Sequence, residues 1–372
     1  MFNKVKGINI LSKFDIVLFL LVGTLTAIGF VVLRSATATM NTGAGILRTQ
    51  LISICLGVVL CIIVSFIDYE YYKVLGYVFY GVTLLLLIYV IPFGWGRGVE
   101  GINSNSWIII SGFKFQPAEL AKITYMLAVP ALLAKLKEEF NIRDLILAIV
   151  LGVAPIGLIL MQPDFGTAAV FSIGLIAVVF VYGIKYRYVL IGFILAAIAA
   201  PLSWFFILKD YQKERIVALL NPLNDVQGSG YQTQKARIAI GSGQLRGSGL
   251  FNGLQSQQNG AIPVKESDFI FSVVGEELGF IGSVLIILIF AAILIWCMRT
   301  AIKSKDAYGS FMVTGLTAMI AFHIIENIGM NIGIMPVTGI PLPFISAGGS
   351  AMLMNFIAIG LIMSVSARSR MP

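Results

Sequence analysis

Two similar motifs place acidic residues at the start of apolar segments: QPAEL at residues 116–120 and QPDFGT at residues 162–167. Proline suits the first turn of a helix, because its missing N–H would have no intrahelical partner there. An acid in that turn, here Glu119 or Asp164, favours the positive end of the helix dipole. The two carboxylates are therefore either good helix starts or the acidic lining of one outward-facing cavity, and the motifs alone leave both interpretations open.

Lys122 lies three residues after Glu119 on the same helical face, where it could neutralise the carboxylate. A Glu–Lys pair just inside an apolar segment is costly unless protein or a wet cavity surrounds it, which favours the functional interpretation.

Four polar residues interrupt another apolar stretch. The last three follow the first by three, four and eight residues, which predicts that all four form a stripe on one face of a helix. The stripe consists of His323, Glu326, Asn327 and Asn331. A hydrogen-bonded contact between helices is favoured over a functional role, but Glu326 remains a candidate cavity residue. The following segment, PVTGIPLPFISAGGS at residues 336–350, cannot be a continuous helix because of its prolines. Irregular backbone at membrane depth survives against protein or water, so it is expected to line a cavity.

Asp268 stands at the end of a polar loop, directly before an apolar run. Such an acid is commonly an N-cap. The alternative is a general base at a membrane surface.

The elements that must position these residues are membrane spans. The chain has 372 residues, of which 58% are hydrophobic and only 12% charged, and its mean hydropathy is +0.93. So few charges could not cover a core this apolar, and lipid must do so. The chain has a net charge of +8. In a membrane protein such an excess usually marks cytoplasmic loops and contact with anionic lipid, so no nucleic-acid partner is expected.

The fold class is therefore an all-α integral membrane protein with about ten transmembrane helices in a single polytopic domain, residues 1–372. Apolar runs fall near 15–34, 46–67, 71–92, 119–135, 144–161, 166–184, 187–208, 270–297, 308–331 and 346–367. Lys and Arg concentrate in alternate connections, which predicts that both termini are cytoplasmic. Cys55, Cys61 and Cys297 fall inside spans and are interpreted as packing residues.

The connection at about 209–269, between the seventh and eighth spans, is long, polar and glycine-rich, and this topology places it outside the cell. Residues 214–220 form an amphipathic pattern that ends before Pro222. The glycines from Gly241 to Gly253 would let the backbone approach a ligand or the membrane surface closely. A flexible glycine-rich loop is the alternative.

The sequence has no GxxxxGK[ST] motif and no Rossmann or zinc signature. Its polar candidates gather on the expected outer side, where ATP and nucleotide sugars are scarce. An enzyme there needs a substrate that carries its own activation, such as a lipid diphosphate-linked sugar. A carboxylate would deprotonate the acceptor hydroxyl, and basic groups or a metal would stabilise the diphosphate.

The chain resembles the SEDS family of shape, elongation, division and sporulation proteins. Six strings carry the resemblance in family order and cover essentially the whole chain: QPAEL, QPDFGTA, NPLNDVQGSGYQTQ, IAIGSGQLRGSGL, SDFIFSVVGEELGFIG and PVTGIPLPFISAGGS. The short N-terminus and the GLQSQQNG stretch are more similar to the elongation branch than to the division branch. Four places depart from the usual pattern: Ala118, Ser106, residues 265–267 and Ala347. Ser106 replaces a frequent arginine, which removes one possible diphosphate contact.

The resemblance implies a peptidoglycan glycosyltransferase of the bacterial cytoplasmic membrane that polymerises lipid II, with a class B penicillin-binding protein as partner. It implies that Asp268 is the essential aspartate and that Glu119 and Lys122 are the paired acid and lysine. Lys122, Arg215 and a divalent cation such as Mg²⁺ are the candidates to stabilise the diphosphate. A lipid II flippase and a scaffold for the penicillin-binding protein are the rival functions, and a division or sporulation paralogue would perform the same chemistry.

Overall fold

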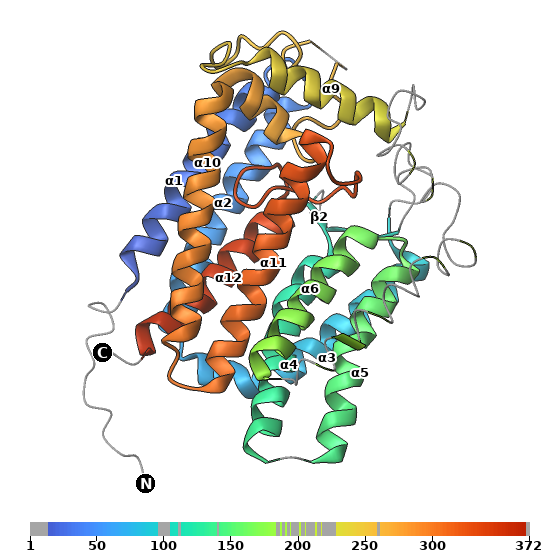
Figure 1. Ribbon diagram of the computed structural model, residues 1–372, viewed down its shortest axis with the longest axis vertical. Helices are drawn as coiled ribbons and strands as arrows, with labels where there is room; N and C mark the ends of the chain where they lie inside the picture. Colours follow the sequence, from blue (N-terminus) through green and yellow to red (C-terminus); the bar gives the residue numbers. More distant parts are fainter. Residues whose placement is uncertain are drawn as a thin grey trace.

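The computed structural model describes residues 14–95, 105–110, 113–139, 141–183, 228–258 and 261–369, with single residues between 187 and 217. These residues form ten α-helices and one two-stranded antiparallel sheet (Figure 1). Nine of these helices are long and apolar enough to cross a membrane. They are α1 (Ile16–Ala36), α2 (Gly43–Phe66), α3 (Tyr69–Phe93), α4 (Pro117–Glu138), α5 (Ile142–Met161), α6 (Phe165–Tyr182), α10 (Ile270–Ile302), α11 (Ala307–Ile332) and α12 (Gly349–Arg368).

The predicted fold class is confirmed, since each of these nine helices coincides with an expected span to within a few residues. The tenth expected span, near 187–208, lies largely outside the described residues, as do the amphipathic pattern at 214–220 and Arg215.

Burial divides the helices into a core and a lipid-facing shell. In the most apolar 18-residue stretch of α4, 94% of the residues are buried, against 22% in the corresponding stretch of α5 and 28% in those of α3 and α10. Large apolar side chains are exposed on the outer faces of these shell helices, among them Val74, Leu85, Ile149 and Leu288. Exposed apolar surface of this extent is stable only in contact with lipid. Buried α4 is thus the central helix that carries Glu119 and Lys122 into the interior.

Small residues allow close helix contacts, as is usual in membranes. Helices α2 and α12 pack extensively against each other. A Cβ added at Gly360 of α12 would lie 3.0 Å from the Cα of Cys61, and one added at Gly57 of α2 would overlap the ring of Phe356. All three cysteines are free; Cys61 and Cys297 are buried, as expected for packing residues, whereas Cys55 is exposed, so that prediction is wrong for Cys55.

The bundle has two distinct ends. Helix α9 (Ser229–Ser242) lies across one end, where α10 begins (Figure 1), and we call this the α9 end. At the opposite end, Asp15 caps α1 and accepts hydrogen bonds from Trp296 Nε1 at 2.8 Å and Ser366 Oγ at 2.7 Å. The start of α1 therefore lies beside the ends of α10 and α12.

A short hairpin that the sequence did not predict precedes α4. Strands β1 (Ile108–Ile110) and β2 (Phe113–Phe115) pair antiparallel, with Ile109 opposite Lys114. A bridge between Trp95 and Trp107 extends the pairing back to the end of α3. The hairpin thereby fixes Ser106 and Trp107 beside the first turn of α4.

The described part of the long connection is ordered, so the alternative of a flexible glycine-rich loop does not hold for residues 228–258. These residues form α9 and a series of turns that pack on α10. The glycines do permit a close backbone approach, here to helix α10: Gly247, with φ +78°, meets the backbone of Glu277 and Gly279. Gly279 itself has φ +68° and ψ −167°, which divides α10 into two helical pieces.

Candidate functional site

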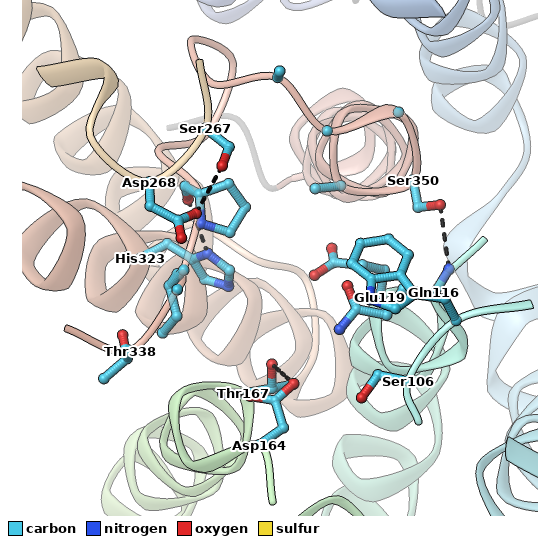
Figure 2. Close-up of a pocket in the computed structure, with 18 of the residues that line it drawn as sticks. Ser106, Gln116, Glu119, Asp164, Thr167, Ser267, Asp268, His323, Thr338 and Ser350 are labelled. Carbon is cyan, nitrogen blue, oxygen red and sulfur yellow. Dashed lines mark hydrogen bonds between the residues drawn. The ribbon is translucent and has the colours of Figure 1, made fainter. Parts of the chain in front are cut away.

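A cavity of about 370 Å³ lies at the α9 end of the bundle. Its walls come from the starts of α4, α6 and α12 and from His323 of α11. They also include residues 338–341, 347 and 348, Ser267 and Asp268, and Ser106 and Trp107, which directly precede β1 (Figure 2). Glu119, Asp164 and Asp268, predicted from three separate parts of the sequence, all line this one cavity. In Figure 2, Asp268 and His323 stand on one side, Glu119 and Gln116 on the other, and Asp164 with Thr167 below them.

Asp268 is held in place through its backbone. Its carbonyl oxygen accepts hydrogen bonds from Asn327 Nδ2 at 2.9 Å and Asn331 Nδ2 at 3.0 Å. Asn331 also accepts from the backbone N–H of Ser272 in the first turn of α10. The carboxylate Oδ1 accepts from Ser267 Oγ at 2.9 Å. Two of the four residues of the polar stripe on α11, Asn327 and Asn331, thus make a hydrogen-bonded contact, as the sequence favoured, and this contact positions Asp268.

The irregular segment after α11 holds the neighbouring backbone. Ser346 Oγ donates to the carbonyl of Ser267 at 2.6 Å, and the N–H of Ala347 donates to the carbonyl of Glu266 at 2.8 Å. Gln50 of α2 also holds the segment in place, because its side chain donates to the Ser346 carbonyl and accepts from the Gly348 N–H. The segment lines the cavity, as its prolines and glycines predicted.

Glu119, Lys122 and His323 form a buried chain. Lys122 Nζ lies 2.8 Å from Glu119 Oε1 and 3.0 Å from His323 Nε2. A charged lysine donates to both, so His323 Nε2 is the acceptor and Nδ1–H faces the Pro341 carbonyl at 3.4 Å. Glu119 Oε2 is buried without a hydrogen-bond partner among the described residues. The chain connects α4 to α11 and leaves one carboxylate oxygen of Glu119 without an internal partner.

Asp164 is the N-cap of α6, as the helix-start interpretation requires. Its Oδ1 accepts from the N–H of Thr167 at 3.0 Å, and its Oδ2 accepts from Thr167 Oγ1 at 2.9 Å. Burial raises the pKa of the Asp164 carboxyl, and these two hydrogen bonds oppose the rise. The same side chain lines the cavity, so the two interpretations of this acid are compatible.

Two expected site residues are described but do not line the cavity. Lys122 lies behind Glu119, and Glu326 is 2% exposed with neither carboxylate oxygen hydrogen-bonded to any described residue. The cavity also contains residues that sequence reasoning did not propose as site residues, among them Trp107, Ser267 and Thr338. Trp107 carried a signal, because it follows the position where the family frequently has arginine.

No group of three or more His, Cys, Asp and Glu side chains in the described part of the chain is placed to hold a metal ion. A divalent cation therefore stays a prediction, and the carboxylates that line the cavity are those of Glu119, Asp164 and Asp268.

Comparison with known proteins places this geometry in a family. The model of the FtsW, RodA and SpoVE family, described as "Cell cycle protein", matches residues 15–371. The chain belongs to this family. The match covers all the described residues except the first and confirms the resemblance to SEDS proteins.

Three differently named relatives match at similar identity. The peptidoglycan glycosyltransferase MrdB of Escherichia coli K12 is 32% identical over 327 residues, which cover 88% of this chain and 87% of MrdB. Stage V sporulation protein E of Bacillus subtilis 168 is 34% identical, with 96% of this chain and 98% of that protein covered. A probable peptidoglycan glycosyltransferase FtsW of Geobacter metallireducens is 33% identical, with 97% and 96% covered.

Solved structures share the fold over nearly the whole chain. The rod shape determining protein RodA of Thermus thermophilus has a TM-score of 0.70 at 28% identity, with 96% of this chain and 98% of RodA covered. A chain of a peptidoglycan synthase complex, studied for how polymerization and crosslinking are coordinated, has a TM-score of 0.79 at 31% identity, with 95% and 97% covered.

Proposed function

We propose that this family member is a peptidoglycan glycosyltransferase that polymerises lipid II into glycan strands on the outer face of the bacterial cytoplasmic membrane during cell elongation. The observation that carries the proposal is the convergence of Asp268, Glu119 and Asp164 on one cavity at the α9 end. Relatives named peptidoglycan glycosyltransferase, aligned over almost the whole chain, support the same activity.

Asp268 acts as the general base in this proposal. Its carboxylate takes the proton from the 4-hydroxyl of the acceptor GlcNAc. The hydroxyl oxygen forms a bond to the anomeric carbon of the donor's terminal MurNAc, and the bond from that carbon to the diphosphate oxygen breaks. Undecaprenyl diphosphate leaves with the bonding electrons, and a single displacement inverts the anomeric configuration. The hydrogen bonds from Asn327 and Asn331 hold Asp268 in place for this step.

The departing diphosphate needs positive charge. Lys122, Arg215 and a divalent cation remain the candidates. Lys122 Nζ contacts Glu119 and His323 and does not line the cavity, so it would act on the diphosphate only at a distance, with its charge largely balanced by Glu119. Arg215 lies outside the described residues.

A class B penicillin-binding protein is the proposed partner, because it would crosslink the strands that this chain polymerises. The structural relative from a complex that coordinates polymerization and crosslinking supports this pairing. The chain is a multi-pass membrane protein. We place the α9 end outside the cell and both termini in the cytoplasm, because the short connections at the opposite end hold more Lys and Arg than the short connections at the α9 end.

The polar arrangement argues against a flippase that performs no chemistry. A flippase requires polar residues on a path through the membrane. Among the described residues the acids that line the cavity gather at one end of the bundle, while at the opposite end Asp15 of α1 accepts hydrogen bonds from α10 and α12. A scaffold would give these acids no chemical role. A division or sporulation protein would share the chemistry, and the similar identities to MrdB, FtsW and the sporulation protein do not separate these roles.

The activity can be tested with the purified chain in complex with its penicillin-binding partner. Labelled lipid II is added, and a gel resolves the glycan strands. The proposal predicts a ladder of strands that persists when the partner's transpeptidase is blocked by a β-lactam. Absence of strands from the intact complex would contradict it.

A further inference from the structure

We propose that the cavity is a saccharide subsite: it holds an uncharged acetylated sugar of the substrate and leaves the diphosphate outside its mouth. Glu119 Oε2 accepts a hydrogen bond from a sugar hydroxyl or acetamido N–H, and Trp107 packs against the sugar ring. The inference rests on the proposed function, because it states which part of a lipid-linked saccharide the same site binds.

The unpartnered oxygen of Glu119 is the first observation. Glu119 is 4% exposed and lines the cavity, and its Oε2 has no hydrogen-bond partner among the described residues, while Oε1 is occupied by Lys122. A buried oxygen without a partner costs free energy that a ligand donor recovers. An ionised carboxylate only accepts hydrogen bonds, so the ligand must supply an O–H or N–H. A phosphate oxygen at neutral pH supplies neither.

The rest of the lining has the chemistry of carbohydrate recognition. An aromatic ring, Trp107, faces the cavity together with a side-chain amide, Gln116. Hydroxyl groups from four different segments complete the wall: Ser106, Thr167, Thr338 and Ser350. Aromatic faces pack against the apolar C–H face of a sugar ring, and a few convergent polar groups fix its orientation.

The charge of the lining excludes the diphosphate. Three carboxylates line the cavity, and the described lining contains no lysine or arginine. Lys122 neutralises Glu119 from behind, which leaves Asp164 and Asp268 to repel an anion at close range. Ser106, where the family frequently has arginine, fits an uncharged ligand.

Binding without turnover tests the inference. The purified full-length protein is mixed with N,N′-diacetylchitobiose, an uncharged acetylated disaccharide, and saturation-transfer NMR detects its binding. We expect transfer to the acetamido and ring protons that a large excess of inorganic diphosphate does not abolish. Glu119→Gln should weaken the affinity about 10- to 100-fold, the effect of losing one hydrogen bond to a charged group. Trp107→Ala should lose the signal without stranding a buried charge.

Trp95→Phe is the matched control, because Trp95 pairs with Trp107 through its backbone but is not in the cavity lining, and it should bind as the wild type does. No transfer in the wild type, displacement of the disaccharide by diphosphate, or normal binding by Trp107→Ala would each overturn the inference. Strand formation is measured separately. A protein that makes strands without binding the disaccharide would refute the subsite alone, whereas one that binds it without making strands would refute the proposed polymerase.

Discussion

The backbone and the side chain of Asp268 have separate roles in the site. Its backbone carbonyl accepts from two buried asparagines of α11, while its carboxylate lines the cavity. Asn327 and Asn331 are both fully buried. Because these two hydrogen bonds hold only the backbone carbonyl, the side chain at position 268 can be substituted without removing them.

The Glu119–Lys122 pair should behave as one unit. Removing either partner strands a buried charge, which costs about 3 to 5 kcal/mol. Glu119→Ala and Lys122→Ala should therefore each lower the thermal unfolding midpoint and strand formation together. The double substitution should be less harmful than the sum of the single ones, as a double-mutant cycle on unfolding would measure. Strict additivity would show that the two residues act independently despite their 2.8 Å contact.

The sequence predicted this pair because a spacing of three residues fixes the shared face of a helix. It did not predict that His323 would contact Lys122, or that Gln50 would brace the segment beside Asp268, because these residues are 201 and 296 positions from their partners. Long-range contacts of this kind depend on how helices pack, and local spacing carries no signal for them.

At the scale of elements, the connection before α10 is anchored by two buried acids. Glu276 accepts from the backbone N–H groups of Gln255 and Ser256, both at 2.7 Å. Glu277 accepts from Ser35 of α1 and from Ser256 Oγ, both at 2.8 Å. These bonds attach the turns after α9 to α10 and α1, and they hold the chain that leads to Asp268.

Gly247→Ala should detach these turns. Its φ of +78° disfavours any Cβ, and the added Cβ would overlap the Glu277 carbonyl. Strain of this kind costs about 1 to 3 kcal/mol, so we expect a lower unfolding midpoint and faster proteolysis between residues 243 and 258. Gly241→Ala is the control, because Gly241 lies in α9 with nothing near its Cβ position, and it should be neutral or slightly stabilising. Equal effects of the two substitutions would refute this account of the turns.

The membrane spans were predictable, because a segment of about twenty apolar residues commonly crosses the lipid bilayer as a helix, which satisfies its own backbone hydrogen bonds. The β1–β2 hairpin and α9 were not predicted. Each strand has three residues and little periodicity, and α9 has the polar sequence SGYQTQKARIAIGS. Such elements form because the helices beneath provide a surface to pack on.

For the whole molecule, orientation decides whether the site faces lipid-linked substrate outside the cell. On a background without the three native cysteines, Leu254→Cys probes the α9 end, where Leu254 is 80% exposed, and Lys305→Cys probes the opposite end. A membrane-impermeant thiol reagent should label Leu254→Cys in intact cells and Lys305→Cys only after permeabilisation. The reverse pattern would place the cavity in the cytoplasm and exclude the proposed function.

The most direct test of the account is strand formation from labelled lipid II by the Asp268→Asn complex, compared with wild type. Asparagine is nearly isosteric, can still accept from Ser267 Oγ, and leaves the backbone bonds of Asn327 and Asn331 unchanged. It cannot take up the proton of the acceptor hydroxyl, so we predict a loss of about 10²- to 10⁴-fold in rate. The unfolding midpoint and the co-purification of the penicillin-binding partner should be unchanged. Strand formation near the wild-type rate by this folded mutant complex would contradict the claim that Asp268 is the base.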